Sequence, residues 1–335
     1  MRALVLHTTG PVEDRRLVMT DRPVPAPGPG EILVKVSACG VCHTELDEIE
    51  GRLAPRLPIV PGHQIVGRVD GAGAGASRFK EGDRVGIAWI HSACGRCRHC
   101  RAGAENLCLD ARWTGKDADG GYAEYTVVPE GFAYPIPERF SDTEAAPLLC
   151  AGVIGYRALR LSGLTNGQTL ALFGFGASAH IVIQMVRHRY PDSGIYAITR
   201  SEHHRELARR LGASWAGSAG DTPPAAFDCA IDFTPVGSTV RDALAWLAPG
   251  GRLVINVIRK RDPIPALDYA THLWHEREIK SVANVTRRDA EEFLPLAAAI
   301  PIVPEVRTFG LDEANDALIL LKQGAIQGAA VLSMR

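Results

Sequence analysis

Four cysteines lie within fifteen positions of the sequence, at Cys94, Cys97, Cys100 and Cys108. Their pattern is C-x2-C-x2-C-x7-C, in which two-residue gaps let neighbouring thiolates turn onto one ion and the longer gap lets the chain return. Four thiolates fill the tetrahedral shell of Zn2+ and leave no open position, as in a structural site. Unligated buried thiols and an iron–sulfur cluster are the alternatives. Because the intervening RCRHCRAG is polar, we predict a structural zinc.

Three further residues could bind a metal, but they are dispersed along the chain. Cys42 stands in ACGVCHTEL, His63 in PGHQIVG and Cys150 in LLCAGV. Taken singly, a histidine is more often a satisfied polar residue than a ligand, and a cysteine more often a small hydrophobe. Together they would supply three ligands and leave a fourth position open, which a catalytic zinc requires. Sequence spacing does not establish that they meet.

A glycine pattern predicts a third kind of site. Gly174, Gly176 and Ala179, in LALFGFGASAH, match G-x-G-x-x-G/A between an apolar strand and a helix. The first glycine permits a tight turn, the second lets a pyrophosphate approach the backbone, and the small alanine allows close packing of helix on strand. Glycines that serve packing alone are the alternative. The strand-to-helix context favours dinucleotide binding, with the phosphates at the helix N-terminus.

The elements that must position these residues change character near residue 150. Before it, the short strands are separated by Gly and Pro and predict a β-rich fold: EILVKVSACG, HQIVGRVDG, GDRVGIAWI and YAEYTVVPE. After it, strands and helices alternate, which predicts right-handed βαβ crossovers and a parallel sheet: TLALFGFG, ASAHIVIQMVRHRY, IYAITR, SEHHRELARRLG, FDCAIDFT, TVRDALAWLAPGG and RLVINVI.

The tail carries two helical patterns, RRDAEEFLPLAAA and LDEANDALILLKQG, and then the short strand GAAVLSM. It could return to the first domain. We therefore expect one domain formed by residues 1–150 with 286–335, and a dinucleotide-binding domain formed by residues 151–285. A length of 335 residues fits two domains, since it exceeds what one core usually serves.

Composition excludes several classes of protein. Hydrophobic residues make up 46% and charged residues 22%, which are globular values, and no segment has the length of a membrane span. The N-terminal MRALVLHTTGPVEDRR lacks the features of a signal peptide, so we expect a cytoplasmic protein. Clustered cysteines there indicate metal rather than disulfides. A net charge of −1 gives no general attraction for nucleic acid or membrane lipid, and we expect neither as a partner.

The order of the motifs resembles that of the zinc-dependent medium-chain alcohol dehydrogenases over essentially the whole chain. The matching stretches are ACGVCHTEL, PGHQIVGRV, KEGDRVGI, the cysteine cluster, DGGYAEY, LLCAGVIGYRAL, FGFGASAH and LAPGGRLV. The resemblance implies an α/β protein with a GroES-like β-rich catalytic domain, a doubly wound Rossmann cofactor domain and an active site in the cleft between them. It further implies a homodimer or homotetramer that transfers hydride between a small alcohol, aldehyde or ketone and a nicotinamide cofactor.

The same resemblance assigns residues. It implies two zincs per chain, a catalytic one on Cys42, His63 and Cys150 and a structural one on the four clustered cysteines. Thr44 matches the hydroxyl that exchanges the alcohol proton, although it could simply cap the local turn. His43 matches a position that meets the cofactor pyrophosphate. Trp89 resembles an aromatic of the pocket wall, and plain core would look the same in the sequence.

Three positions depart from the usual family pattern. Asp47 stands where many members place the histidine that ends the proton relay, and a carboxylate is the weaker base, so this path would be slower or run through water. Ile154 replaces a threonine that often contacts the nicotinamide. Gln64 stands where an acid usually lies behind the zinc. Removing one negative charge about 5 Å from the metal changes the electrostatic energy at the metal by roughly 3 kcal/mol. This corresponds to a change of about two units, as an upper limit, in the pKa of a group bound to the metal. We therefore expect alcohol or water at this zinc to deprotonate at lower pH than with a glutamate at position 64.

The choice of cofactor depends on IYAITRSEHH. An NAD site usually shows an acid after the second strand, whereas here Thr199 is followed by Arg200 and Ser201. A guanidinium pairs well with a 2′-phosphate, so NADP(H) is favoured and NAD(H) remains possible. The alternative is that Arg200 is a solvated charge and Ser201 only caps the following helix.

Two rival functions use part of the same sequence. A zinc-independent quinone or enoyl reductase of the same superfamily would share the glycine pattern, but such reductases do without Cys42, His63 and Cys150. A zinc-ribbon protein that binds nucleic acid would use the four-cysteine cluster alone and leave the other motifs without a role.

Overall fold

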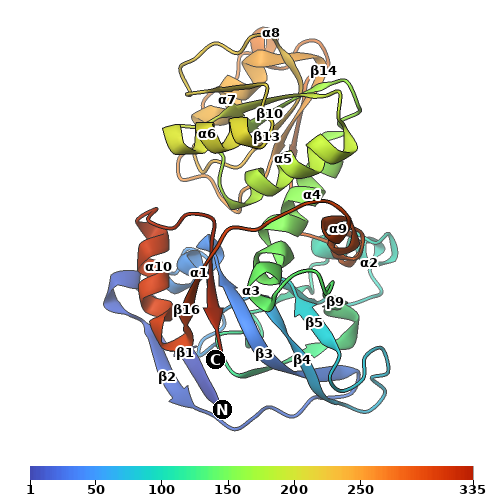
Figure 1. Cartoon of the computed structure of the whole chain (residues 1–335), viewed down its shortest axis with the longest axis vertical. Helices are drawn as coiled ribbons and strands as arrows, with labels where there is room; N and C mark the ends of the chain where they lie inside the picture. Colours follow the sequence, from blue (N-terminus) through green and yellow to red (C-terminus); the bar gives the residue numbers. More distant parts are fainter. Residues whose placement is uncertain (335) are drawn as a thin grey trace. The chain divides into compact units, whose positions relative to one another are not determined.

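The computed structural model describes residues 1–334 and divides into two compact units (Figure 1). Unit 1 comprises Met1–Cys150, Asn284–Ala298 and the chain from Val303 onward, and unit 2 comprises Ala151–Ala283 and Ala299–Ile302. The sequence pattern assigns residues 299–302 to the first domain. In the structure they belong to unit 2, and this short segment includes the buried side chains of Ile300 and Ile302.

Unit 1 is β-rich and contains a seven-stranded sheet in the order β16-β17-β3-β4-β5-β9, with β8 also paired to β3. Its pairs are antiparallel except for β16 with β17. The elements before residue 151 are β1 (Arg2–Leu6), η1 (Val12–Asp14), β2 (Leu17–Asp21), β3 (Glu31–Val41), α1 (His43–Ile49), β4 (Gln64–Ala72), β5 (Arg84–Ile87), β6 (Ile90–Ser92), α2 (Arg98–Arg101), η2 (Glu105–Leu107), β7 (Arg112–Trp113), β8 (Tyr125–Pro129), η3 (Glu130–Phe132), β9 (Ala133–Pro135), α3 (Asp142–Ala145) and η4 (Ala146–Leu149).

The tail returns to unit 1, as its pattern allows. It forms α9 (Arg287–Ala299), β16 (Val306–Gly310), η5 (Leu311–Glu313), α10 (Ala314–Lys322) and β17 (Ala329–Ser333). Strand β17 enters the sheet beside β3, where Leu332 lies opposite Cys39. The predicted helix LDEANDALILLKQG is split into η5 and α10, and β16 has no counterpart among the predicted strands.

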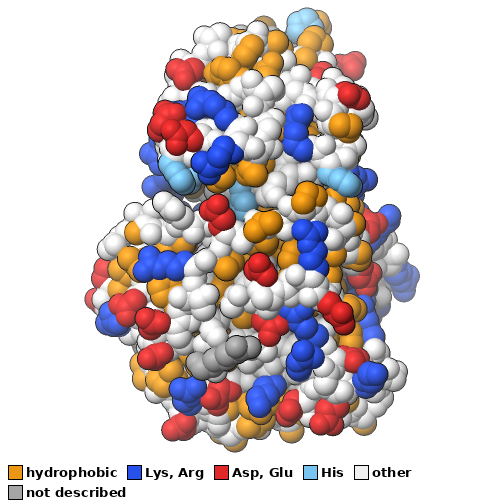
Figure 2. All heavy atoms as spheres, in the orientation of Figure 1, with side chains coloured by type: hydrophobic (Ala, Val, Ile, Leu, Met, Phe, Trp, Pro, Cys, Tyr) orange, Lys and Arg blue, Asp and Glu red, His pale blue; other side chains and the backbone are white. Residues whose placement is uncertain are grey.

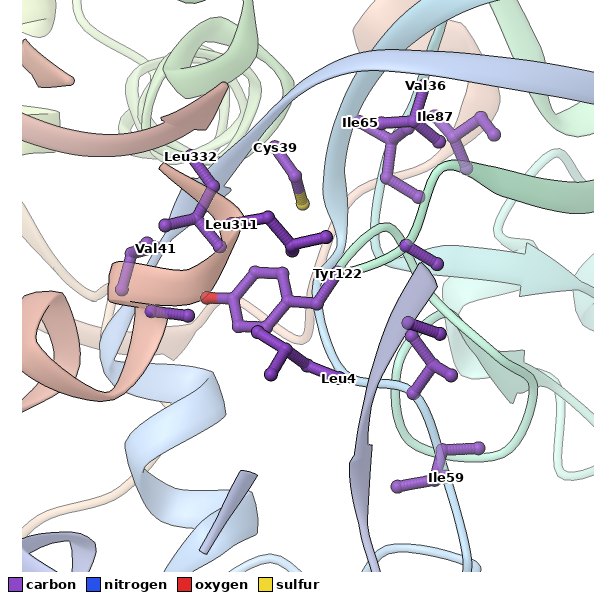
Figure 3. Packing of buried hydrophobic residues seen from close by; sticks show 14 of the residues in the cluster. Leu4, Val36, Cys39, Val41, Ile59, Ile65, Ile87, Tyr122, Leu311 and Leu332 are labelled. Carbon is purple, nitrogen blue, oxygen red and sulfur yellow. The ribbon is translucent and has the colours of Figure 1, made fainter. Parts of the chain in front are cut away.

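The core of unit 1 packs around a buried tyrosine. Figure 3 shows the ring of Tyr122 among Leu4, Val41 and Leu311, with Cys39 nearby. Apolar side chains from the first strand, the central sheet and the C-terminal segment therefore share one core. Burial of such side chains is the main favourable contribution to the stability of the unit.

Unit 2 contains a six-stranded parallel sheet in the order β12-β11-β10-β13-β14-β15. Its elements are α4 (Ala151–Ser162), β10 (Thr169–Phe173), α5 (Ala177–Arg189), β11 (Gly194–Ile198), α6 (Glu202–Arg210), β12 (Trp215–Gly217), β13 (Phe227–Asp232), α7 (Ser238–Trp246), β14 (Leu247–Ile255), α8 (Tyr269–His272) and β15 (Glu278–Ser281). The strand order reverses between β10 and β13, where dinucleotides bind in doubly wound sheets. The predicted β-rich domain and the predicted doubly wound parallel-sheet domain are both present.

The surface carries charges of both signs. Figure 2 shows Lys and Arg interspersed with Asp and Glu over the visible face, in line with a net charge of −1. Over residues 1–334, no helix has the length and apolar character needed to cross a bilayer.

Candidate metal and dinucleotide sites

The strand ladder of unit 1 brings the three dispersed candidate ligands together. Gly40 at the end of β3 pairs with Gln64 at the start of β4, so the residues just beyond this pair lie at the same end of the ladder. Cys42 is the N-cap of α1, His63 immediately precedes β4, and Cys150 follows η4. One donor atom from each lies within 4.8 Å of the other two. Three ligands from distant parts of the chain thus face one point.

His63 is held in an orientation that suits a metal ligand. Its Nδ1 lies 2.5 Å from Oε1 of Glu45, and both side chains are buried. Its Nε2 is also buried and has no hydrogen-bond partner among residues 1–334. Burial opposes the charged imidazole, but the Glu45 carboxylate and Cys42 together outweigh it and raise the pKa of His63. A carboxylate on one ring nitrogen that leaves the other free is the usual arrangement of a zinc-bound histidine.

The two thiols complete a donor set for Zn2+. A hydrogen bond with Cys150 lowers the pKa of Cys42 well below its ordinary value, and His63 acts in the same direction. The same bond raises the pKa of Cys150. Two thiol groups that share a proton, beside an unpartnered imidazole nitrogen, fit a Cys2His zinc site with one open position.

Glu45 is a functional residue that the sequence pattern does not reveal. It accepts a hydrogen bond from the backbone N–H of Cys42 at 2.9 Å as well as contacting His63, and so it connects two of the three ligands. The only indication of Glu45 in the sequence is its position three residues after Cys42, because an acid at that distance from the N-cap is typical of the start of a helix. Gln64, the position where the family resemblance leads us to expect an acid, is buried against Gly40. A Cβ atom added to Gly40 would lie only 2.6 Å from the amide oxygen of Gln64, so the two residues are in close contact.

The other predicted residues around the ligands occupy distinct surroundings. Thr44 is buried, with its Oγ1 3.7 Å from Sγ of Cys42, whereas His43 is exposed. Asp47 is buried and accepts a hydrogen bond from Nε of Arg52 at 2.5 Å. The predicted end of the proton relay therefore carries an ion pair that the sequence pattern does not show.

An aromatic stack lies beside the ligands. The ring of Trp89 is 5.9 Å from the ring of His63 and 4.9 Å from that of Trp113. Trp89 therefore lies close to a candidate ligand, and its place in a pocket wall stays a prediction. Ile154 lies on α4 in unit 2 and is half-buried.

The clustered cysteines also converge. The Sγ atoms of Cys94, Cys97, Cys100 and Cys108 all lie within 4.8 Å of one another. The backbone N–H groups of Arg96 and Cys97 lower the pKa of Cys94 to about 6, which favours its thiolate. Desolvation and the neighbouring Cys97 raise the pKa of Cys100. Four sulfurs at this spacing fit a closed tetrahedral zinc site.

The glycine turn of unit 2 has the geometry that its pattern predicts. Gly174 has a φ of +82°, which glycine adopts readily. Gly176 is the N-cap of α5, and a Cβ added to it would meet no described atom within 4 Å, so the backbone there is open to a ligand. Ala179 is fully buried. The start of α5 is thus free to receive phosphate groups.

The residues after β11 carry the candidate 2′-phosphate contacts. Thr199 is buried, and Arg200 is exposed with no hydrogen-bond or ion-pair partner for its guanidinium among the described residues. Ser201 caps α6 by accepting the backbone N–H of His204 at 3.4 Å, which was the alternative role for it. Arg205, which the sequence pattern does not single out, donates to the carbonyl oxygens of Thr199 at 2.8 Å and Arg200 at 3.0 Å.

Comparison with known proteins identifies the family. The model of the alcohol dehydrogenase GroES-like domain matches residues 28–138. The curated "Probable alcohol dehydrogenase AdhA" of Mycobacterium tuberculosis (strain CDC 1551 / Oshkosh) is 46% identical, over 99% of this chain and 97% of its own length. The chain belongs to the zinc-dependent medium-chain alcohol dehydrogenases. It is an oxidoreductase of the alcohol dehydrogenase type.

Two further relatives of this dehydrogenase carry names that bear on its cofactors. The "NAD-dependent alcohol dehydrogenase" of Sulfolobus acidocaldarius is 34% identical over the full length of both chains, 100% of each. A cobalt- and zinc-bound thermostable alcohol dehydrogenase from Pyrobaculum aerophilum has a solved structure that matches with a TM-score of 0.88 and 26% identity, over 99% of each chain.

The dehydrogenase also has a buried ion pair beside the glycine turn of unit 2. The ammonium group of Lys260 contacts the fully buried carboxylate of Asp232 at the end of β13. It also donates to the carbonyl oxygens of Thr234 at 2.8 Å and Val236 at 3.1 Å, and Thr234 donates to Asp232 through both its backbone N–H and its hydroxyl, each at 2.8 Å. A Cβ on Gly174 would lie 3.1 Å from Cγ2 of Thr234, so this network borders the turn.

Proposed function

We propose that this enzyme is a zinc-dependent alcohol dehydrogenase or aldehyde reductase that transfers hydride between a small alcohol, aldehyde or ketone and a nicotinamide cofactor. The observation that carries the proposal is the convergence of Cys42, His63 and Cys150, with Nε2 of His63 buried and unpartnered within residues 1–334. The convergence argues against a zinc-independent reductase, which has no use for this donor set.

Each residue of the site has a proposed role. Zn2+ bound by Cys42, His63 and Cys150 would act as a Lewis acid toward the substrate oxygen. Glu45 keeps the imidazole of His63 oriented, and Thr44 takes the alcohol proton through its hydroxyl. Because the carboxylate of Asp47 is paired with Arg52, we place the onward path of the proton through water rather than through Asp47.

Metal analysis tests this assignment. The purified protein should contain two zinc ions per chain, one on the three-ligand set and one on the four clustered cysteines. Cys150→Ser should remove one zinc and the activity. Cys229→Ser is the matched control, because Cys229 is a buried cysteine that belongs to neither set. A wild-type protein with a single zinc per chain would contradict the proposal and favour the zinc-independent reductase.

We propose NADP(H) as the preferred cofactor. Support comes from the absence of an acid at Thr199 and from the exposed guanidinium of Arg200, which has no partner in the described part of the chain. A hydrogen bond to a charged group contributes about 1.5–3 kcal/mol, so Arg200→Ala should weaken NADPH binding by roughly 10- to 150-fold and leave NADH nearly unchanged. Arg210→Ala, at the far end of α6, is the control. A wild type that clearly prefers NADH would refute the assignment.

We propose a homodimer or homotetramer in which β15 takes part. This strand ends the sheet of unit 2, and all four of its residues are exposed. Ile279 is 40% exposed, and Tyr269 and Trp274 are exposed to 63% and 53%. An exposed strand edge beside apolar side chains favours pairing with another strand. Ile279→Lys should therefore lower the molar mass measured by light scattering, whereas a monomeric wild type would contradict the proposal.

Substrate and location complete the proposal. A panel of small alcohols, aldehydes and ketones assayed with both nicotinamide cofactors tests the substrate class and the direction. We place the enzyme in the cytoplasm, because the six cysteines assigned to zinc need a reducing compartment.

A further inference from the structure

A third buried acid on α1, after Glu45 and Asp47, has no role in the site described so far. Glu48 is 1% exposed, and neither of its carboxyl oxygens has a hydrogen-bond partner among residues 1–334. Buried polar groups in folded proteins are nearly always hydrogen-bonded, because leaving one unpaired is unfavourable. Its neighbour Glu45, equally buried, contacts both Cys42 and His63. A buried carboxyl group without a partner therefore calls for a function.

The surroundings of Glu48 belong to the candidate metal site. Residues three apart on a helix are neighbours, so Glu48 lies on the same side of α1 as Glu45. Burial raises the pKa of Glu48, the charge of Glu45 raises it further, and His63 opposes both; Cys42 is also close enough to act on it. Glu48 is therefore within electrostatic reach of two ligands and of the acid that orients one of them.

A hydroxyl group lies within electrostatic range of the same acids. The Oη of Tyr122, the tyrosine of the unit 1 core in Figure 3, is buried and has no hydrogen-bond partner in the described chain. After burial, the charges acting on it include those of Glu45 and Glu48. A buried carboxyl group and a buried hydroxyl group, both without a hydrogen-bond partner among residues 1–334, therefore lie within electrostatic range of Glu45.

Gln64, the residue that follows His63, is buried and contributes no charge to the candidate metal site. The resemblance to related enzymes places an acid behind the zinc at this position, and here it is an amide packed against Gly40. A cation bound in a region that solvent does not reach is stabilised by a nearby carboxyl group much more than it would be in water. Within unit 1, Glu48 is a buried acid that is bonded to no ligand and still lies within reach of the set.

We infer that Glu48 is a positioning residue of the metal site, whose buried carboxyl group, on the same side of α1 as Glu45, strengthens the binding of a divalent cation by Cys42, His63 and Cys150. The inference rests on the proposed function, because it requires the three-ligand set to bind a metal.

Zinc affinity measured by competition with a chelator tests the inference. Glu48→Gln keeps the size of the side chain and removes the acid, and Glu48→Leu also removes its polarity. Both variants should bind zinc about 10-fold or more weakly at the three-ligand set, the size of effect typical for residues that support metal ligands. The four-cysteine site is the internal control and should keep its affinity. Cys150→Ser, which retains only that site, identifies which zinc is lost.

A rescue variant separates charge from packing. Gln64→Glu in the Glu48→Gln background returns an acid to the region and should recover most of the lost affinity. Wild-type affinity in both single variants, parallel loss at both zinc sites, or a double variant no better than Glu48→Gln would each overturn the inference. A wild type with only one zinc per chain would instead refute the proposed function, so the two failures are distinguishable.

Discussion

Removal of the ammonium group of Lys260 should destabilise unit 2 by an amount that depends on pH. The group contacts the carboxylate of Asp232, which is fully buried, and its own side chain is only 12% exposed. Removing one partner of a buried ion pair typically reduces the free energy of unfolding by about 3–5 kcal/mol. Because Asp232 keeps two hydrogen bonds from Thr234, we expect Lys260→Met to reduce the free energy of unfolding by about 3 kcal/mol at neutral pH.

The direction of the pH dependence follows from the carboxyl group. Burial raises the pKa of Asp232, and Lys260 opposes that rise, so the pKa will be higher still in Lys260→Met. A carboxyl group with a raised folded-state pKa contributes stability that is complete below its unfolded value, about 3.9, and is lost as pH rises through the folded-state value. The deficit of the variant relative to wild type should therefore be smaller at pH 5 than at pH 8.

Urea denaturation at pH 5 and pH 8 measures the difference in free energy of unfolding between wild type and Lys260→Met. Titration with nucleotide tests whether the substitution also disturbs the turn at Gly174. Asp232→Asn combined with Lys260→Met replaces the ion pair by neutral groups and keeps the acceptor for Thr234. This double variant should recover much of the stability and show no added dependence on pH. Equal deficits of Lys260→Met at pH 5 and pH 8, or a deficit below about 1 kcal/mol, would refute the reasoning.

Three further outcomes follow from the sites. Glu45→Gln should weaken zinc binding at the three-ligand set by about 10- to 100-fold in a chelator competition, and unchanged affinity would mean that the contact with His63 does not support the metal. Cys97→Ser should remove one zinc and lower the melting temperature while the other zinc stays bound, which metal analysis checks. Burial lowers the pKa of His91 to about 4, so stability should fall as pH drops from 6.5 toward 4, by about 3 kcal/mol at most. His91→Gln should remove that part of the slope, and identical slopes would contradict the assignment.

A metal site can be predicted from the sequence when its ligands lie close together in the chain, and much less well when only the fold brings them together. The four clustered cysteines are separated by short gaps, so their spacing alone predicts convergence on one ion. Cys42, His63 and Cys150 converge only because β3 and β4 pair and η4 ends nearby, and no spacing rule encodes that. Their assignment came from the resemblance to a family.

The surroundings of the ligands were harder to predict than the ligands. The family pattern directs attention to Gln64, whereas the acid that contacts His63 is Glu45 and the unpaired one is Glu48; burial, which the sequence does not show, distinguishes them from exposed helix charges. Asp232 and Lys260 are 28 residues apart and meet only in the folded sheet.

Fold prediction failed where strands lack an apolar pattern. Strand β15 has the sequence EIKS and is exposed at all four positions, so nothing in its hydrophobicity marks it as part of the parallel sheet. It is a strand because β14 offers it a partner edge. By contrast, β10, α5, β11, α6 and β13 were predicted to within a few residues. Helix α4 was not predicted, and LAPGG, assigned to the preceding helix, forms the first part of β14.

The pairing of β17 with β3 has a consequence for how the chain is made. Strand β3 leads into Cys42, yet the strand that covers its edge, Ala329–Ser333, is synthesised almost 300 residues later. Ala151–Ala283, most of unit 2, emerges from the ribosome well before that. Because domains fold as units during synthesis, the nucleotide-binding unit can fold first, while the sheet beneath the metal ligands waits with an open edge. Until β17 is added, the nascent chain has an open strand edge that is prone to aggregation, and the framework beneath the candidate metal ligands is incomplete.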